Sequence, residues 1–304
     1  MFDLNDPEVA YAEETHEKIL LVYWMLGTTC TYTCSYCPPK FHDGKFAYQP
    51  YDIILETMEK LPPCHVMFTG GEATYHPEFE KIVHNAPSHI RVSVISNASR
   101  PVAFWERIVD RFKVVMLTFH AEFADLDRFF KTAELVYKES KRGGAINITM
   151  IPAHWDKCVE AYHRFIDAGM LVTVKPLVDN FGFQSSSVIS DYSPEQLEWI
   201  KEKTNKNTNK NFATYNSKNE LLFKTTPAEM LARNQTNFNG WTCYTPTQFL
   251  YINAAGDAYN TSCKQREHVG NIYTEFRLTS EPTICKQNFC WCYMDIMTKK
   301  VKNV

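Results

Sequence analysis

Short apolar runs alternate with longer amphipathic stretches from residue 19 to about residue 180. The apolar runs are rich in Val, Ile and aromatic residues and mostly continuous, which is typical of strands covered on both faces. They predict six strands, at 19–26, 65–70, 91–96, 113–119, 145–151 and 171–178. The stretches between them predict helices at about 50–60, 76–85, 101–111, 122–141 and 155–168. Six repeats imply a parallel sheet but not a full eight-stranded barrel, so we expect an α/β fold with a partial (β/α)6 barrel.

The pattern changes near residue 190. Residues 191–239 are polar and rich in Asn and Lys, and we expect a helix from Pro194 to about Lys203 followed by a solvated loop. After residue 240, the segment TQFLYINAAGDAYNTSC predicts two short strands around an Ala-Gly-Asp turn. We therefore divide the chain into an N-terminal extension (1–18), the barrel (19–190), a polar connecting region (191–239) and a small cysteine-bearing module with little helix (240–304).

Composition and charge argue against several classes of protein. Of the 304 residues 44% are hydrophobic, which is enough for a sizeable core. The net charge of −3 argues against a nucleic-acid binder that uses a basic surface. No run of about 18 apolar residues predicts a membrane span, and the acidic, polar start lacks the pattern of a signal peptide. We therefore expect a cytoplasmic protein that binds neither membrane nor nucleic acid.

The ten cysteines are placed unevenly. Three lie at 30–37 and five at 243–292, and only Cys64 and Cys158 lie between these groups. In a chain with no export signal, clustered cysteines more often bind metal or take part in chemistry than form disulfides. For Cys64 and Cys158 we favour packing in the core.

The first group lies in the loop CTYTCSYC, where Cys30, Cys34 and Cys37 have the spacing C-x3-C-x2-C. Thiolates hold iron–sulfur clusters, and a four-iron cube needs one ligand for each iron. Three cysteines would leave one iron open to a chelating small molecule that can receive an electron. The alternative is a zinc site, which prefers paired C-x2-C elements and four ligands, with His42 as a conceivable fourth. The spacing favours the iron–sulfur interpretation.

The loops after the other predicted strands should face the same edge of the sheet, because the carboxyl ends of parallel strands converge there. Two glycines at 70–71 permit a close approach of backbone to a ligand, and the carboxylate of Glu72 suits an ammonium group. Short polar groups at Ser96 and Asn97 suit hydroxyls or a carboxylate, and Tyr36 offers an aromatic face. Together these groups suit a ligand with an amino acid end, a ribose and a purine.

With these motifs the chain resembles the radical S-adenosylmethionine superfamily. CTYTCSYC looks like its C-x3-C-x-(aromatic)-C signature, and GGE after the second strand looks like its methionine-amine motif. The resemblance spans about residues 19–180 and implies a 4Fe-4S cluster on Cys30, Cys34 and Cys37 that chelates S-adenosylmethionine. The family's Gly-x-Ile-x-Gly-x-x-Glu pattern is absent from INITMIPAH near the fifth strand. The residues assigned to the cofactor are Gly70, Gly71 and Glu72 for the ammonium group, Ser96 and Asn97 for ribose and carboxylate, and Tyr36 for adenine.

The second group of cysteines resembles the twitch or shortened SPASM extension of the same superfamily, which binds an auxiliary iron–sulfur cluster. Gly256 and Cys263 fit that pattern loosely, while the C-x4-C-x-C ending departs from the usual C-x2-C. Five cysteines permit one closed 4Fe-4S cluster and one spare thiol, and the choice among the last three stays open. A structural zinc site is the alternative. The candidate ligands are Cys243, Cys263, Cys285, Cys290 and Cys292.

The resemblance implies that S-adenosylmethionine is split reductively into methionine and a 5′-deoxyadenosyl radical, which takes a hydrogen atom from the substrate. An external donor such as a flavodoxin or ferredoxin would supply the electron. Similar extensions occur in enzymes that modify peptides, sugars or aminocyclitols, so we expect a peptide or small-molecule natural product as substrate. An auxiliary cluster favours oxidation. The alternatives are an epimerase with a cysteine hydrogen donor and, in another class, a non-catalytic redox carrier.

Candidate catalytic and substrate-binding residues follow the last three predicted strands of the barrel. We expect His120 to act in catalysis because it follows its strand directly, although a histidine bonded to nearby backbone is the alternative. Cys158 or the spare C-terminal thiol is the candidate hydrogen donor. The remaining candidates are Glu122, His154, Lys175 and Asp179.

Overall fold

The computed structural model describes residues 3–14, 19–140, 144–178, 188–204, 212–263 and 265–303. Within these residues the strands form one sheet of nine strands and one of six. No helix in the described ranges has both the length and the apolar character that a membrane crossing requires.

Six parallel strands form the centre of the larger sheet, whose order is β13-β12-β11-β2-β3-β4-β5-β6-β7. Each neighbouring pair from β2 to β7 is parallel, which confirms the partial (β/α)6 barrel. The six predicted strands are all present, with ends that differ by one or two residues. They are β2 (Leu20–Met25), β3 (Cys64–Thr69), β4 (Ile90–Ser96), β5 (Val115–Phe119), β6 (Ala145–Met150) and β7 (Val172–Pro176).

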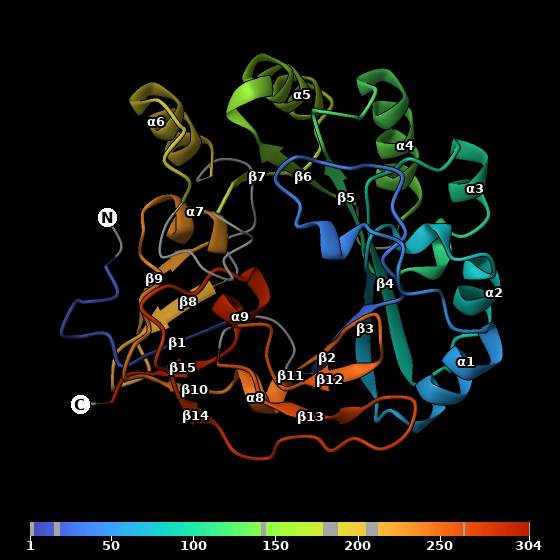
Figure 1. Ribbon diagram of the computed structural model, residues 1–304. Coiled ribbons are helices and arrows are strands. Elements are labelled where there is room, and N and C mark those ends of the chain that lie inside the picture. The colour runs from blue at the N-terminus through green and yellow to red at the C-terminus, as the bar shows by residue number, and fades with distance from the viewer. Residues whose placement is uncertain are drawn as a thin grey trace.

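The helices between these strands lie on the outer side of the curved sheet (Figure 1). All five predicted helices are present, but the third is a short helix followed by a 3₁₀ turn at Val109–Arg111. Gly169 follows the fifth helix with a φ of +75°, so it ends the helix at the position that the sequence predicts. The helices are α1 (Tyr51–Lys60), α2 (Phe79–His84), α3 (Val102–Glu106), α4 (Leu126–Glu139) and α5 (Trp155–Asp167).

A C-terminal hairpin extends the larger sheet beyond β2. Strand β11 (Phe249–Ile252) pairs in parallel with β2. It also pairs with the antiparallel strand β12 (Asp257–Tyr259), followed by β13 (His268–Asn271). The two predicted strands around the Ala-Gly-Asp turn are therefore confirmed. The sequence did not indicate that they join the barrel sheet, which places the cysteine-bearing segment against the barrel.

The second sheet combines strands from the start, the middle and the end of the chain, in the order β14-β10-β15-β1-β8-β9. The solvated loop expected after Lys203 is wrong for residues 212–225, which form the hairpin β8–β9. Phe212 and Thr214 of this hairpin are buried, so the segment packs despite its polar neighbours. The strands are β14 (Thr283–Ile284), β10 (Thr242–Cys243), β15 (Lys300–Val301), β1 (Tyr11–Glu14), β8 (Phe212–Tyr215) and β9 (Leu221–Thr225).

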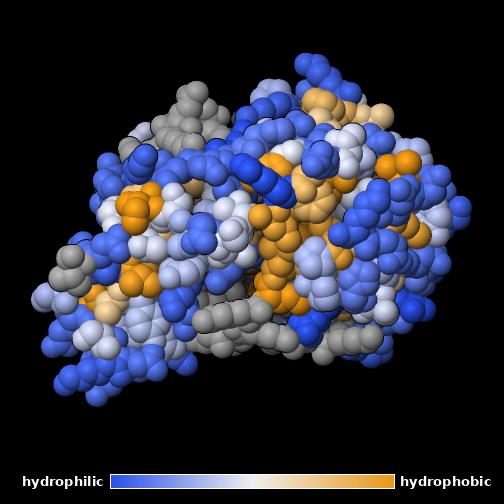
Figure 2. Space-filling view, turned by 90° about the horizontal axis from the view of Figure 1, so that it is seen from below, coloured by the Kyte–Doolittle hydropathy of each residue, from blue (hydrophilic) through white to orange (hydrophobic). Residues whose placement is uncertain are grey.

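Four further α-helices follow β7 in the part of the chain that the structure describes, and two of them, α6 and α8, connect the two sheets. Helix α6 (Pro194–Lys203) has the predicted ends and a capping box between Ser193 and Gln196. Helix α7 (Pro227–Ala232) is buried along its whole length. The last two, α8 (Thr245–Gln248) and α9 (Tyr293–Met297), are short, as expected for a module with little helix. From below, the surface is mostly hydrophilic, with hydrophobic residues gathered in a strip near its middle (Figure 2).

Candidate functional site

The loop after β2 carries the first three cysteines, and the loop after β3 holds it in place. The backbone N–H of Gly71 donates to the carbonyl oxygen of Gly27 at 3.0 Å, and that of Glu72 donates to Thr29 at 2.8 Å. A Cβ added to Gly71 would lie 2.4 Å from the Thr29 oxygen. The diglycine therefore lets this loop close on the backbone that leads into Cys30.

The carboxylate of Glu72 joins the loops after β3 and β4. It accepts hydrogen bonds from Ser96 Oγ at 2.8 Å, from the backbone N–H of Asn97 at 2.7 Å and from Thr74 Oγ1 at 2.6 Å. Burial raises its pKa, while these donors oppose the rise. The sequence-predicted Glu72, Ser96 and Asn97 are therefore brought together in one buried network.

The same network reaches the first cysteine. Asn97 Nδ2 lies 3.7 Å from Cys30 Sγ, and the backbone N–H of Tyr32 donates to the same sulfur at 3.4 Å. Hydrogen bonds to sulfur are a means by which proteins tune iron–sulfur clusters. Burial raises the pKa of Cys34 to about 11 and that of Cys37 to about 12, so their thiolates need a compensating positive charge, as a bound metal provides.

All ten cysteines are free thiols. His42, the conceivable fourth ligand, has its Nε2 3.1 Å from the carbonyl oxygen of Cys37. Its ring nitrogen thus has a backbone partner in the cysteine loop. Among the described residues, no three His, Cys, Asp or Glu side chains form a group that could hold a single metal ion.

Two residues after β5 also contact the cysteine loop. The ring of Tyr36 stacks on that of His120, with centroids 6.0 Å apart, and the Tyr36 hydroxyl is hydrogen-bonded to His120 Nδ1. Burial, together with the positive charge of Lys175, lowers the pKa of His120 to about 4. Glu122 accepts a 2.8 Å hydrogen bond from the backbone N–H of Ser35. His120 and Glu122 therefore both contact the cysteine loop itself.

Lys175 lies near the carboxyl end of β7, opposite Thr149 of β6. Its Nζ is 4.6 Å from the centre of the Tyr293 ring in the C-terminal module. Burial lowers its pKa to about 8, and the nearby thiol of Cys292 opposes this effect. Lys175 therefore faces the region between the barrel and the module.

The remaining candidates are spread apart. His154 is exposed in the turn after β6, and Asp179 lies outside the described residues. Cys158 is completely buried in α5, with its Sγ 3.5 Å from the carbonyl oxygen of Thr149, and burial raises its pKa to about 11. This position favours the packing role for Cys158, as it does for the equally buried Cys64.

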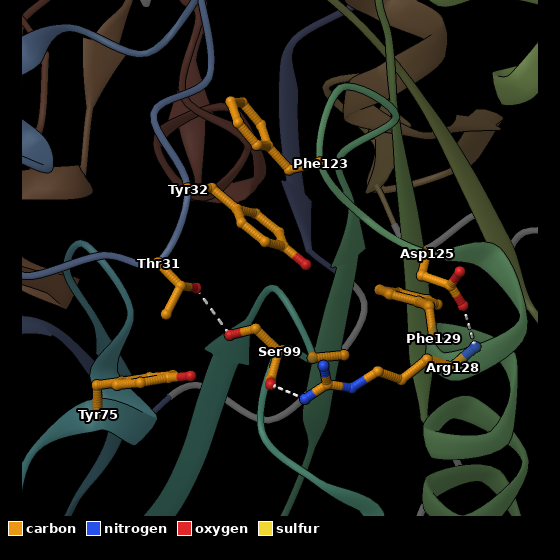
Figure 3. Close-up of a pocket in the computed structure, with 9 residues that line it drawn as sticks. Thr31, Tyr32, Tyr75, Ser99, Phe123, Asp125, Arg128 and Phe129 are labelled. Carbon is orange, nitrogen blue, oxygen red and sulfur yellow. Dashed lines mark hydrogen bonds between the residues drawn. The ribbon is translucent and has the colours of Figure 1, made fainter.

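A cavity of about 240 Å³ lies beside the cysteine loop (Figure 3). Its walls include Thr31 and Tyr32 of that loop, Ser99 after β4, and Arg128 in the first turn of α4. Thr31 Oγ1 donates to Ser99 Oγ at 2.9 Å, and the Arg128 guanidinium donates to the Ser99 carbonyl oxygen. Sequence reasoning missed Arg128. The residue that could have indicated it is Asp125, a typical residue for the start of a helix. Its side chain caps α4 by accepting a 2.8 Å hydrogen bond from the backbone N–H of Arg128, which fixes the first turn of the helix.

Four of the five C-terminal cysteines influence one another. Burial raises the pKa of Cys290, and negative charge on Asp295, Cys263 and Cys243 adds to the rise. Burial also raises the pKa of Cys285, with a contribution from Cys243. The four thiols linked through Cys243 in this way are here called the module thiols: Cys243, Cys263, Cys285 and Cys290.

Cys292 shares the neighbour Asp295 with the module thiols and also interacts with the barrel. It is the N-cap residue of α9, and its charge acts on Tyr23 of β2, Lys175 of β7 and Tyr251 of β11. All three belong to the barrel sheet. Cys292 thus lies where the C-terminal module meets the barrel.

Comparisons with known proteins agree with this geometry. The family model described as the radical SAM superfamily matches residues 24–174, about half of the chain. Among curated proteins none matches.

Two solved structures illustrate the likeness of fold. The histidine-tagged form of anSMEcpe with bound AdoMet has a TM-score of 0.55 and 16% identity, over 84% of this chain and 78% of that one. Streptococcus suis SuiB bound to precursor peptide SuiA has a TM-score of 0.57 and 13% identity, over 86% of this chain and 64% of SuiB. Because the matched segment contains both the three-cysteine loop and the diglycine–glutamate loop, on a partial barrel, the chain belongs to the radical SAM superfamily.

Proposed function

We propose that the protein binds S-adenosylmethionine at a 4Fe-4S cluster on Cys30, Cys34 and Cys37 and takes a hydrogen atom from a peptide or small-molecule substrate. The observation that carries the proposal is the network in which Glu72 and Asn97 join the loops after β3 and β4 to Cys30. When bound and reduced, such a cluster supplies the electron that splits S-adenosylmethionine into methionine and a 5′-deoxyadenosyl radical. An external flavodoxin or ferredoxin would deliver this electron.

The chain's own residues would orient the cofactor. Gly70, Gly71 and Glu72 would hold the ammonium group, Ser96 and Asn97 the ribose and carboxylate, and Tyr36 would lie near the adenine. The cavity beside the cysteine loop adds a guanidinium, that of Arg128, which suits a carboxylate. It also offers the ring of Tyr32, stacked on Phe123 with centroids 5.5 Å apart.

An auxiliary 4Fe-4S cluster would be held by the module thiols. Their donor set fits, because four buried or half-buried sulfurs supply one ligand for each iron. Cys292 would then be the spare thiol, facing the barrel. With an auxiliary cluster as electron acceptor, we favour an oxidised product.

The substrate would lie between the barrel and the module. His120 and Lys175 supply a neutral imidazole and an ammonium group there, and His120 is our first choice for proton movement or substrate binding. A peptide substrate is supported by the solved relatives, since SuiB was obtained with its precursor peptide and anSMEcpe with the Cp18Cys peptide. A small molecule with an unactivated C–H bond is the other class that the chemistry admits.

The test uses protein reconstituted without air. The parent should contain about eight irons, for two four-iron clusters, and should form 5′-deoxyadenosine from S-adenosylmethionine and dithionite. The variant Cys30→Ala/Cys34→Ala/Cys37→Ala should retain about four irons and form none. Continued cleavage by the triple variant, or a parent that cleaves nothing and only carries electrons, would refute the proposal.

Running the reaction in deuterated water and measuring the mass and deuterium content of the product shows what happens to the substrate radical. Oxidation gives a product two hydrogens lighter with no deuterium gained. An isomeric product with one deuterium would instead identify an epimerase, because a thiol exchanges its hydrogen with solvent. In that case Cys292→Ala should abolish the product while Cys158→Ala should not.

A further inference from the structure

Lys300 is a buried cation in the C-terminal module. Its side chain is only 1% exposed, although lysine is almost never fully buried without a partner. It lies in β15 directly opposite Cys243 of β10. Because directly opposed residues project from the same face of a sheet, its side chain shares a face with one of the module thiols.

The hydrogen-bond partners of Lys300 carry no net charge. Its Nζ donates to the carbonyl oxygens of Asp295, Ile296 at 3.1 Å and Thr298 at 3.0 Å, and lies 4.7 Å from the centre of the Phe238 ring. Lysine side chains commonly donate hydrogen bonds to the last carbonyl oxygens of a helix. That role explains the position of the nitrogen, but it leaves a full positive charge in a buried place.

The nearest carboxylate is directed elsewhere. Asp295 is also buried, and its Oδ2 accepts a 2.9 Å hydrogen bond from Ser262 Oγ. Its Oδ1 has no hydrogen-bond partner within the described ranges, where Lys300 likewise forms no ion pair with a carboxylate. Burial raises the pKa of Asp295 to about 6, and the positive charge of Lys300 opposes that rise, so this carboxylate supplies one negative charge near the buried ammonium group.

One module thiol also lies close to Lys300. Thr245 Oγ1 is 3.2 Å from Cys243 Sγ and 3.5 Å from the Asp295 carbonyl oxygen to which Lys300 donates. Burial raises the pKa of Cys285 and Cys290, and the positive charge of Lys300 opposes the rise at both. A four-iron cluster bound by four thiolates carries a net negative charge in both oxidation states. Reduction adds one more negative charge. A cation fixed nearby, in surroundings of low polarity, therefore favours the reduced state.

We propose that Lys300 balances the negative charge of the auxiliary cluster and so raises its reduction potential. This inference rests on the auxiliary site of the proposed function. The step concerned would be the transfer of one electron from the substrate radical to the cluster. The oxidised substrate would then release a proton to water, and no bond would form or break at Lys300. A higher potential makes the cluster a better acceptor for that electron.

The experiment uses the full chain with Cys30, Cys34 and Cys37 changed to Ala, so that only the auxiliary cluster is present. A redox titration followed by electron paramagnetic resonance gives its midpoint potential. Lys300→Gln removes the charge but keeps an N–H donor for the carbonyls of α9. At a fixed potential we expect its ratio of reduced to oxidised cluster to fall about tenfold, equal to about 59 mV for one electron. Lys300→Arg should keep the parental midpoint.

A matched control lies two residues further along the chain. Lys302 donates to the carbonyl oxygens of Leu4 at 3.4 Å and Asp6 at 3.0 Å, so Lys302→Gln removes a lysine that bonds carbonyls of the N-terminal segment instead of those around α9. Its midpoint should stay at the parental value. If Lys300→Gln does not fold, Lys300→Met provides the second neutral variant, and iron content and thermal unfolding are measured for each.

The outcomes separate the two proposals. A cluster with an unchanged midpoint in Lys300→Gln, or an equal shift in Lys302→Gln, overturns the role of Lys300 and leaves the auxiliary site intact. If the triple variant with Lys300 intact shows no four-iron signal, both the auxiliary site and this inference are overturned. A lowered midpoint in the neutral variants of Lys300 alone, restored in Lys300→Arg, supports it.

Discussion

Replacing Gly71 by Ala tests how the cysteine loop is held. The added Cβ would lie 2.4 Å from the carbonyl oxygen and 2.7 Å from the carbonyl carbon of Thr29. Favourable contacts between carbon atoms lie at about 3.5–4.0 Å, so the two backbones must separate by about 1 Å. Both clashing atoms belong to the backbone of Thr29, which cannot rotate away from the added methyl group as a flexible side chain could.

The expected cost has two parts. Overpacking of this kind destabilises a protein by about 1–3 kcal/mol, and the 2.8 Å hydrogen bond from Glu72 to Thr29 would be stretched. Because Thr29 immediately precedes Cys30, a shift of about 1 Å would reach the first thiol and, through it, the reacting atoms. Misplacement of that size can cost about 100-fold in rate. We therefore expect Gly71→Ala to form 5′-deoxyadenosine about 100-fold more slowly.

The matched control is Gly169→Ala. Gly169 has a φ of +75° and nothing within 4 Å of an added Cβ, so its replacement costs about 1–2 kcal/mol through backbone strain alone. It ends α5, far along the chain from the cysteine loop. The assay measures 5′-deoxyadenosine per four-iron cluster, with urea unfolding for stability. A wild-type rate in Gly71→Ala would refute the reasoning, and an equal loss in Gly169→Ala would assign the effect to general destabilisation.

Three further predictions concern His120 and Cys158. His120→Ala should reduce product more than substrate-free 5′-deoxyadenosine, and an equal loss of both would place His120 with the cofactor or the fold. Because burial lowers the pKa of His120 to about 4, the unfolded chain binds more protons between pH 6.5 and 4. Stability should therefore fall with acidification across this range, by up to about 3 kcal/mol, and His120→Gln should flatten that dependence in urea unfolding. Cys158→Ala should cost about 1 kcal/mol in stability and leave the deuterium content of the product unchanged; a changed content would make Cys158 the hydrogen donor.

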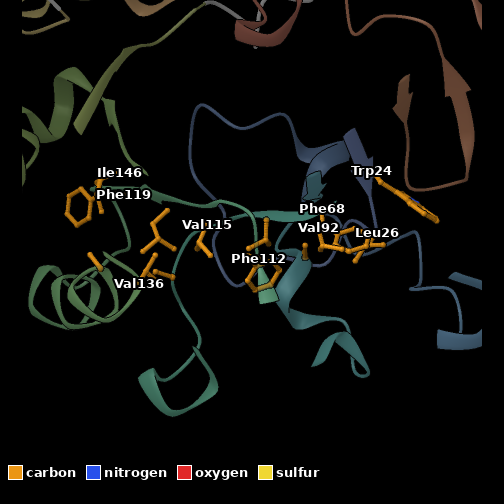
Figure 4. Close-up of a cluster of buried hydrophobic side chains, with 14 of the residues drawn as sticks. Trp24, Leu26, Phe68, Val92, Phe112, Val115, Phe119, Val136 and Ile146 are labelled. Atoms are coloured by element: carbon orange, nitrogen blue, oxygen red, sulfur yellow. The ribbon is translucent and has the colours of Figure 1, made fainter. Parts of the chain in front are cut away.

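The barrel could be predicted from the sequence because its strands carry a clear pattern. Their outer side chains form a buried layer that includes Trp24, Phe68, Val92 and Ile146 (Figure 4). Continuous apolar runs of five to seven residues, separated by amphipathic helices, have few other stable arrangements. The loops at the carboxyl ends of these strands were then placed by topology alone, which is why Glu72, Ser96 and Asn97 were expected to meet.

The second sheet could not be predicted in the same way. Strands β1 and β8 have only four residues each, and β10, β14 and β15 have two, so none has a period that a sequence shows. Their pairing depends on contacts between distant segments. The position of Lys300 opposite Cys243 follows from that pairing, so it could not be predicted from the sequence.

The pairing of β1 with β15 has a consequence for biosynthesis. Tyr11 lies opposite Val301, so this sheet closes only after β15 has been made. Strands β2 to β7 pair with close neighbours in sequence and can associate while translation continues. Cys243 lies on β10, which pairs with β15. The module thiols should therefore assemble only after β15 has left the ribosome, and iron–sulfur loading of the module should follow loading of the cysteine loop in time.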